Sequence, residues 1–512
     1  MRQLFETPTI AALADKLSAL CFHAGGGAPP PLQRAQREHP APASYEQERL
    51  WFIDRLEPNT SAYNFPVALR LSGQLNRNAL ERSLNALVNR HETLRTTFVL
   101  EANSLMQVIA EAAPLKLAVH DLRTFPLSER EAEAKRVTAI EAVAPFDLSQ
   151  GPLLRASLLR LADDDHVLLL MMHHIINDAW SMNVMMQELG TCYNAFVDGR
   201  EPALPSLSIQ YSDYAIWQRE WLEGQTLANR LQYWQDNLAG IPEQLRLTTD
   251  GSRPSVQSSR GSTKFSTLSS DLSERLRNFS QRESVTLFML LLAAWQMLLS
   301  YYSGQLDIVV GTNVANRMWP ATEALVGFFI NALTLRLKLF DNPTCRELLA
   351  RVREITLGAF AHQEVPFAKV VEALNPRRAT SHAPLFQVKI NFVNTPRKDS
   401  ISWHGVEVRN FNIREEISHF DLTLSLADSE RGMRIALVYN TDLFGAETIA
   451  AILADYEFIL DRMSAEPETK TETLRELVRE RMNDRRHHQI ELDRQQQQQK
   501  LTNLRRKFVT TS

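Results

Sequence analysis

Two adjacent histidines and a nearby aspartate carry the most evident chemistry in this sequence. They lie in the stretch LLLMMHHIINDAWS at residues 168–181, where an apolar run ends in His173 and His174 and Asp178 follows four positions later. An imidazole with an ordinary pKa of about 6.5 can accept a proton from an attacking nucleophile, or hold it by a hydrogen bond, near neutral pH. Side chains alternate along a strand, so only one histidine is expected to face a given cavity.

Asp178 is expected to organise the loop rather than to react. A carboxylate buried at the end of a strand needs a cationic or hydrogen-bonding partner to keep its charge. Arg317, in the segment VANRMWP, is the predicted partner. Ser181 is expected to cap the helix that follows, which carries Val184, Met185, Leu189 and Tyr193.

The residues alone leave two interpretations open, because a histidine pair on an apolar strand is also typical of satisfied core histidines. Metal binding is disfavoured, since two successive histidines cannot easily chelate one ion and no HExxH or CxxC spacing accompanies them. The sequence also lacks GxGxxG after a strand, GxxxxGK[ST] and GxSxG. The usual grounds for a dinucleotide, nucleotide-phosphate or serine-hydrolase site are therefore missing.

Composition limits the class of protein. The 512 residues correspond to about two to four domains, and 44% hydrophobic with 23% charged residues allows large cores and excludes wholesale disorder. A net charge of −4 gives no global positive field, so neither nucleic acid nor a membrane surface is an expected partner. Three scattered cysteines and the lack of a long apolar run predict a cytoplasmic protein without a disulfide framework or a membrane span.

The elements that must position these residues alternate between helix and strand. The pattern runs from Ser44 to about Leu207 and returns from Tyr211 to about Ala465, which predicts two layered α/β halves of comparable size. The expected helices are 47–54, 78–90, 211–238, 272–281 and 287–302, and the expected strands are 67–71, 94–100, 167–172, 308–312 and 333–337.

Both ends of the chain differ from these halves. Residues 7–20 have the pattern of one amphipathic helix, and the proline- and glycine-rich stretch 24–42 is typical of a linker. Residues 479–507 are basic and glutamine-rich, which favours a solvated or frayed helix. The alternative is a docking segment for a partner helix, because Leu501, Leu504 and Phe508 recur at helical spacing.

The stretch HHIINDAWS resembles the HHxxxDG motif of condensation domains from nonribosomal peptide synthetases. Further segments resemble the family's other motifs in the family's order, from residue 44 to residue 388. They are SYEQERLWFIDRL at 44–56, RHETLRTTF at 90–98, YSDYAIWQREWL at 211–222, VGFFINALTLR at 326–336, HQEVPFAKVVEAL at 362–374 and SHAPLFQV at 381–388.

The resemblance implies an acyltransferase with two lobes similar to chloramphenicol acetyltransferase, set in a V, with a tunnel from each side meeting at the second histidine. A donor acyl or peptidyl thioester would arrive on the phosphopantetheine arm of an upstream carrier protein, and an acceptor amine on a downstream carrier. The chain would bind no cofactor covalently. Two alternatives remain: a terminal domain that releases the chain onto a free amine or alcohol, and a non-catalytic domain that recruits carriers or tailoring enzymes.

For single residues, the resemblance makes His174 the central catalytic group, which either removes a proton or positions the amine. His173 and Asp178 become supports. Ala179 stands where the family usually has glycine, and we expect activity to survive this added methyl group. The remaining candidates for the tunnel wall or its support are Trp180, Ser181, Arg317, Asn331 and Gln387; for the last two, hydrogen bonding within loops is the alternative.

The resemblance also divides the chain. The expected parts are the last helix of a carrier protein at 1–20, a linker at 21–43, an N-terminal lobe at 44–210, a C-terminal lobe at 211–465 and a tail at 466–512 that is a possible docking segment for another synthetase subunit. The configuration of the donor stays open, because VANR and SMNVMM resemble domains for D-configured donors whereas Leu333 resembles those for L-configured ones.

Overall fold

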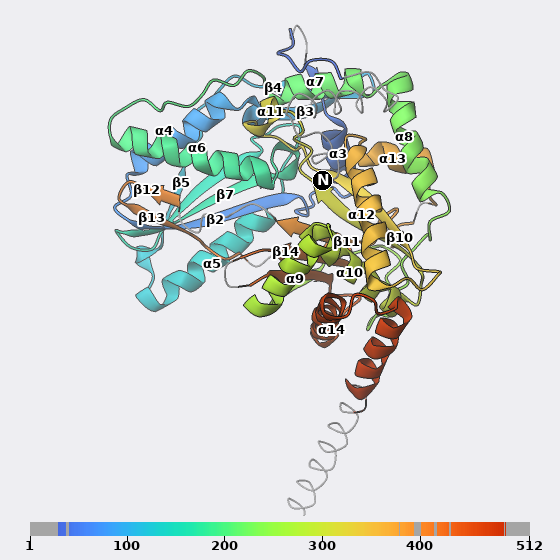
Figure 1. Ribbon diagram of the computed structural model, residues 1–512. Coiled ribbons are helices and arrows are strands. Elements are labelled where there is room, and N and C mark those ends of the chain that lie inside the picture. The colour runs from blue at the N-terminus through green and yellow to red at the C-terminus, as the bar shows by residue number, and fades with distance from the viewer. Residues whose placement is uncertain are drawn as a thin grey trace, which may run out of the picture.

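Figure 1 shows the computed structural model of the chain. It describes residues 29–36, 40–377, 379–393, 401–413, 417–429, 432–485 and 487. The helix expected at 7–20, and the docking residues expected at 501–508, lie outside the described residues.

One six-stranded sheet forms the N-terminal lobe. Its central strand β7 is buried along nearly its whole length, and it pairs antiparallel with β2 and β6. Helices α4 (Arg77–Arg90) and α6 (Ala179–Val197) pack on one face and α5 (Leu127–Val143) on the other (Figure 1). The strand order is β12 (Ile401–Trp403), β13 (Val406–Asn410), β2 (Asn64–Gly73), β7 (Asp165–His173), β6 (Leu154–Arg160) and β5 (Ala118–Asp121).

A second six-stranded sheet forms the C-terminal lobe. Helix α10 (Leu287–Ser303) is buried in its core and packs against α9 (Ser270–Arg282), α12 (Cys345–Ala361) and α14 (Ala446–Ala465). The strand order is β10 (Asn331–Lys338), β9 (Asp307–Val314), β11 (Val388–Val393), β14 (Leu422–Ala427), β15 (Arg434–Asn440) and β8 (Gly261–Thr267).

The two halves are not contiguous in sequence, which corrects the simple division at residue 210. Strands β12 and β13 follow β11 of the C-terminal lobe, yet β13 pairs antiparallel with β2 of the other sheet. Trp403 anchors this crossover, because its buried ring stacks on Tyr193 of α6 at 4.9 Å. The chain therefore crosses back to complete the first sheet before it returns to β14.

The ordered fold also begins before Ser44, inside the expected linker. Strand β1 (Ala41–Pro42) pairs with β4 (Ser104–Ile109), which pairs in turn with β3 (Thr96–Glu101). The indole nitrogen of Trp217 donates a hydrogen bond to the carbonyl of Pro30 at 2.7 Å.

The helix expected at 211–238 is two helices, α7 (Tyr211–Trp221) and α8 (Gly224–Leu238), and Gly224 begins the second with a φ of +54°.

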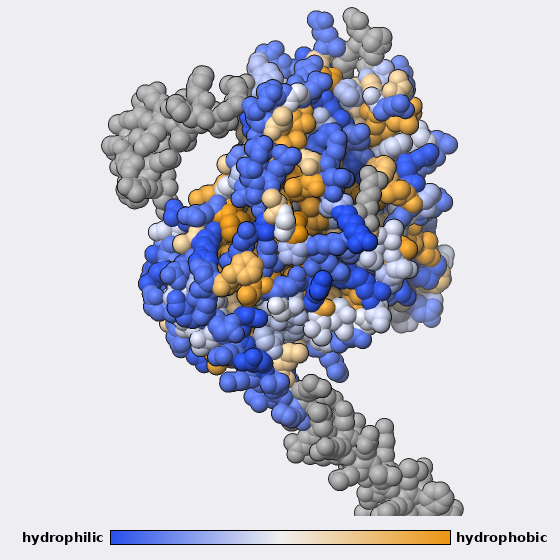
Figure 2. Space-filling view, turned by 90° about the vertical axis from the view of Figure 1, so that its right-hand side faces the viewer, coloured by the Kyte–Doolittle hydropathy of each residue, from blue (hydrophilic) through white to orange (hydrophobic). Residues whose placement is uncertain are grey.

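Figure 2 looks onto the side where α8 and α12 lie, and apolar side chains form separate patches there among polar ones. The remaining elements are α3 (Tyr45–Leu56), η1 (Glu92–Arg95), η2 (Leu122–Thr124), η3 (His174–Ile176), α11 (Pro320–Glu323) and α13 (Phe367–Leu374).

The first part of the expected tail belongs to the fold. Residues 471–485 are helical, and Leu474 and Val478 are buried in the core of the C-terminal lobe. The guanidinium of Arg485 pairs with Asp455 of α14 at 2.5 Å. The sequence predicts a separate tail from residue 466 and a solvated segment from residue 479. The helix at 471–485 corrects the first of these, because Leu474 and Val478 pack into the core.

Cys192 and Cys345 are free and buried, and burial raises the pKa values of their thiols to about 11 and about 12. Among the described residues, no single helix is both long and apolar enough to cross a membrane. Only α9 and α10 taken together reach such a composition, and they are bent by 105° at their junction.

Candidate active site

The histidine motif lies where β7 ends and α6 begins. Strand β7 ends at His173, the single turn η3 follows, and Asp178 is the N-cap of α6. Asp178 accepts a hydrogen bond from the backbone nitrogen of Ser181 at 2.7 Å. The predicted cap is therefore wrong in one detail: Asp178 caps the helix, and Ser181 supplies the N–H that is capped.

His174 presents one free ring nitrogen to a cavity. Its Nδ1 lies 3.0 Å from the carbonyl oxygen of Asn177, and a carbonyl can only accept, so Nδ1 carries the hydrogen and Nε2 keeps its lone pair. The ring edges meet Phe65 and Phe328 at centroid distances of 4.8 and 5.8 Å. Burial lowers the pKa of His174, which keeps the imidazole neutral at pH 7.

The cavity beside His174 has a volume of about 1850 Å³ and lies between the two lobes. Pockets for ordinary small ligands are roughly 300–1,000 Å³, so this one has room for a long substrate arm. Strand β2, helices α5 and α6 and residues 410–413 line it from the N-terminal lobe, and β11, β14 and residues 417–420 line it from the other side. His174 and Ala179 are part of its wall, whereas His173 and Asp178 are not.

His173 faces the core, as strand alternation predicts. Its side chain is 1% exposed, and its Nδ1 accepts a hydrogen bond from the backbone nitrogen of Ile175 at 3.1 Å. Its Nε2 has no hydrogen-bond partner among the residues that the structure describes. Burial lowers the pKa of His173 to about 3, so this ring stays neutral and has a supporting position.

Asp178 and Arg317 form the predicted ion pair, and both side chains are at most 1% exposed. The guanidinium lies 3.3 Å from one carboxylate oxygen of Asp178. The other oxygen accepts a hydrogen bond from the backbone nitrogen of Phe329 at 3.0 Å. Three donors thus satisfy the buried carboxylate, and through them Asp178 joins the start of α6 to a segment of the C-terminal half.

Ser181 makes a second tie to the same segment. Its hydroxyl donates to the carbonyl of Gly327 at 2.7 Å and accepts from the backbone nitrogen of that residue at 3.0 Å and from Arg317 at 2.6 Å. A Cβ at position 327 would lie 1.9 Å from the ring of Tyr211, so only glycine allows this approach. Phe328, whose ring meets His174, is thereby fixed in place.

Ala179 and Trp180 lie at the first turn of α6. The φ of Ala179 is not positive, and its exposed methyl group lines the cavity, so nothing in the local backbone requires glycine. The indole of Trp180 donates to the carbonyl of Glu323 at 2.9 Å and does not line the cavity.

Asn331 and Gln387 lie outside the cavity wall and brace loops. The amide nitrogen of Asn331 donates to the carbonyls of Gln363 and Val365 at 2.8 and 2.7 Å. Gln387 accepts from the backbone nitrogen of Leu245 at 2.8 Å. Both side chains are 2% exposed, so their contacts match the alternative of loop hydrogen bonding rather than a tunnel surface.

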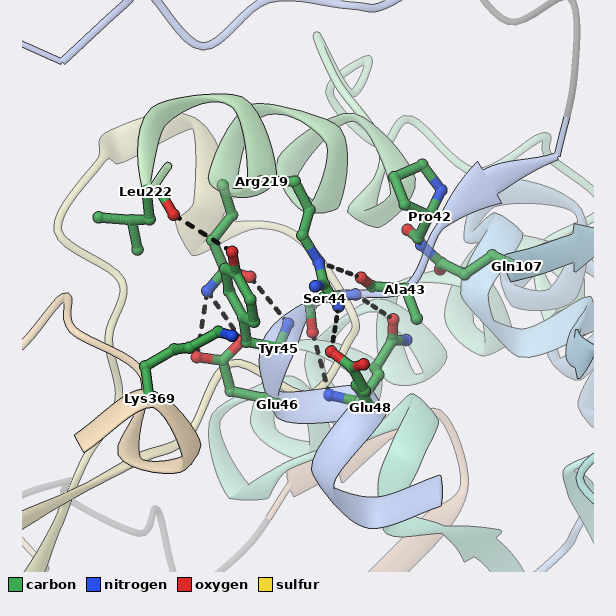
Figure 3. A network of polar contacts seen from close by, with 12 residues as sticks. Pro42, Ala43, Ser44, Tyr45, Glu46, Glu48, Gln107, Arg219, Leu222 and Lys369 are labelled. Atoms are coloured by element: carbon green, nitrogen blue, oxygen red, sulfur yellow. Dashed lines mark hydrogen bonds and ion pairs between the residues drawn. The ribbon is translucent and has the colours of Figure 1, made fainter. Parts of the chain in front are cut away.

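Helix α3 supports the turn η3, which begins at His174. Gln47 completes a capping box with Ser44, and its amide nitrogen also donates to the carbonyl of Ile175 in η3 at 3.2 Å. Figure 3 shows how the start of α3 is held. Arg219 of α7 reaches Ala43 and Glu48, and the ammonium of Lys369 lies 5.5 Å from the ring of Tyr45.

The sequence does not predict two basic residues of the cavity wall, His419 and Lys389. His419 stacks on Tyr63 at 4.8 Å, and Lys389 of β11 lies with its ammonium 5.1 Å from the ring of Phe420. Both are more than 200 positions from the histidine motif and belong to no spaced pattern. The only available signal is that Lys389 directly follows the matching segment 381–388, as the one charged residue of β11.

The condensation domain model matches residues 37–484. The chain belongs to the condensation domain family. One of the linear gramicidin synthase proteins from Brevibacillus parabrevis is 45% identical over 474 residues, which cover 91% of this chain and 9% of that protein. Phosphinothricin tripeptide synthetase PhsB from Streptomyces viridochromogenes is 38% identical over 464 residues, covering 90% of this chain and 39% of that protein. This condensation domain thus spans less than a tenth of the gramicidin synthase protein.

Solved structures confirm the two-lobed fold similar to chloramphenicol acetyltransferase. The X-domain from teicoplanin biosynthesis has a TM-score of 0.79 and 29% identity, over 86% of this chain and 99% of that chain. The starter condensation domain of rhizomide synthetase RzmA has a TM-score of 0.72 and 20% identity, over 85% of this chain and 96% of that chain, which is a likeness of fold alone. Condensation domains of peptide synthetases are acyltransferases that form peptide bonds.

Proposed function

We propose that this condensation domain forms an amide bond by transferring an acyl or peptidyl group from a phosphopantetheine thioester to an acceptor amine. One observation carries the proposal: the Nε2 lone pair of His174 faces a cavity between the lobes that is large enough for two tethered substrates. A free aminoacyl amine has a pKa of about 8, so part of it is already unprotonated at pH 7.

In this mechanism, Nε2 of His174 accepts a hydrogen bond from the attacking amine and orients its lone pair toward the thioester carbonyl. The nitrogen–carbon bond forms, and the proton lost from nitrogen moves to Nε2. The carbon–sulfur bond then breaks, and the imidazolium returns the proton to the leaving thiolate. Holding two tethered reactants together supplies a large part of the rate enhancement.

Asp178 and His173 act by position in this proposal. Neither lines the cavity, so neither touches substrate. Asp178 fixes the start of α6 against Arg317 and Phe329, and His173 fixes the backbone of η3. Both contacts hold the ring of His174 where its free nitrogen meets the cavity.

The substrates and partners follow from the same proposal. An upstream carrier protein delivers the donor, and a downstream carrier delivers the acceptor amine; in a terminal domain, a free amine or alcohol takes its place. Phosphopantetheine enters with the carriers, and the reaction takes place in the cytoplasm. The cavity-facing His174 favours catalysis over the alternative of a domain that only recruits carriers or tailoring enzymes.

The test is turnover between acyl and aminoacyl pantetheine thioesters, followed by mass spectrometry. We expect His174→Ala to lower the rate by about 10²-fold or more, because general acid–base groups typically contribute that much. His120→Ala, a histidine replacement on β5 remote from the motif, is the matched control and should keep the rate. Unchanged product formation by a folded His174→Ala variant would falsify the proposal.

A further inference from the structure

The described wall of the cavity contains no aspartate or glutamate, but it contains three side chains of lysine or arginine. Two of them, Lys135 and Arg136 of α5, are exposed and already paired with Glu131 at 3.5 Å and Glu133 at 2.6 Å. Lys389 differs from both. Within the described part of the chain, its ammonium has no hydrogen bond or ion pair, only the face of the Phe420 ring.

Lys389 faces the cavity because of its register in β11. Val388 and Ile390, its neighbours in the strand, are fully buried in the core of the C-terminal lobe, so alternation turns Lys389 to the opposite face. Asn391 follows two positions later on that face and also lines the cavity. The amide oxygen of Asn391 is buried without a hydrogen-bond partner among the described residues, but an oxygen only accepts, so this atom offers an anion no donor. On this face of β11, the unpaired donor is therefore the ammonium of Lys389.

The surroundings of Lys389 make a ligand of opposite charge favourable. Among the residues that the structure describes, the titratable and charged groups that act on Lys389 are Arg49 of α3, His174 of η3 and His419, and none of these three is acidic. Burial and the charge of Arg49 lower the pKa of Lys389 to about 7. An anion beside the ammonium would raise the pKa of Lys389 again and so offset burial and the charge of Arg49, because it would supply the opposite charge that the described wall lacks.

We propose that Lys389 forms the centre of a carboxylate-binding subsite inside the condensation cavity, so that one of the two substrates carries a carboxylate near the reacting groups. This inference rests on the proposed function. The carboxylate has two possible sources, an acidic donor acyl chain or an acidic acceptor residue, and both would use the same chemistry: a charge-assisted hydrogen bond from the ammonium of Lys389.

Binding is measured first, with pantetheine analogues in which a stable amide replaces the thioester. The donor pair is succinyl and succinamoyl, and the acceptor pair is aspartyl and asparaginyl; within each pair only the carboxylate changes to an uncharged amide. Calorimetry should show at least tenfold tighter binding for one carboxylate member, and the pair that responds identifies the source. Equal binding within both pairs would overturn the inference.

Variants assign the effect to Lys389. Lys389→Met should reduce the preference to less than about twofold, and Lys389→Arg should restore most of it. Lys116→Met, which removes an exposed lysine remote from the cavity, should keep the full preference. The preference should also fall as the pH rises from 6 to 8.5, because Lys389 loses its proton near pH 7. A preference that persists in Lys389→Met would place the carboxylate elsewhere and refute the subsite.

Turnover separates the inference from the function on which it rests. If neutral thioester pairs react and the binding preference is absent, the proposed function stands and the carboxylate subsite falls. If the binding preference is present and depends on Lys389 but no thioester pair reacts, the subsite stands and the catalytic proposal falls.

Discussion

At the scale of single residues, the two histidines have the same chemistry and opposite environments. The ring of His174 meets a cavity, while His173 is 1% exposed and lacks a partner for Nε2 among the described residues. The sequence predicts that they face different sides, because alternation is local. It cannot predict which polar side chains point inward: the amides of Asn331 and Gln387 are bound to backbone groups contributed by distant segments.

The buried His173 makes the stability of the fold depend on pH. Burial lowers its pKa to about 3 in the folded chain, whereas the unfolded chain has an ordinary value of about 6.5. Below pH 6.5 the His173 side chain binds a proton in the unfolded state but not in the folded state. The free energy of unfolding should therefore fall with acid, by up to about 1.4 kcal/mol per pH unit for this group.

Denaturant unfolding of the wild type and of His173→Asn between pH 7 and pH 4 measures this dependence. Asparagine keeps an acceptor for the backbone nitrogen of Ile175 but has no titrating proton. The slope of unfolding free energy against pH should be smaller by close to one proton in the variant. Equal slopes would mean that His173 is protonated in the folded state.

At the scale of elements, the start of α6 and the segment 317–329 hold each other in place. Asp178 and Ser181 from one side meet Arg317, Gly327 and Phe329 from the other, and the side chains that make these contacts are at most 1% exposed. Helix and strand in this region follow from local patterns in the sequence, whereas the N-cap is Asp178 and not the predicted Ser181. The pairing of the two segments is long-range, and only the demand of a buried carboxylate for a cation made it predictable.

Breaking this pair should cost more than its net contribution to stability. Arg317→Met leaves Asp178 buried with two backbone donors and no cation, and we expect a loss of about 3–5 kcal/mol in unfolding free energy. The double variant Asp178→Asn with Arg317→Met should lose less than the sum of the two single changes, because no charge is left uncompensated. Additive losses in denaturant titrations would show that the two groups are not coupled.

At the scale of the whole molecule, the helix at 471–485 extends the core of the C-terminal lobe. Leu474 is fully buried and Arg485 reaches Asp455, although the composition of this region suggests solvated chain. Sequence composition averages over a window, so it hides a narrow apolar stripe of two or three residues. The same limit applies to the crossover of β12 and β13, since a strand pattern does not name the sheet that it joins.

Leu474→Asp should release this helix, because an unpaired carboxylate cannot stay in the apolar site. Amide hydrogen exchange in residues 471–485 should increase by at least tenfold, and the melting temperature should fall. Thr473→Asp adds the same charge at the neighbouring exposed position and should leave both unchanged. Protection that survives in Leu474→Asp would show that burial of Leu474 is not what holds the helix to the core.

The crossover of β12 and β13 restricts how the lobes can move apart. Strand β13 is hydrogen-bonded to β2 along five residue pairs, although β11 and β14, which precede and follow the crossover in sequence, belong to the sheet of the C-terminal lobe. A wide separation of the two lobes would have to break the hydrogen bonds between β13 and β2. Under the proposed function, the two substrate arms therefore enter a cavity whose lobes share one intact sheet, and only small motions of one lobe against the other keep that sheet intact.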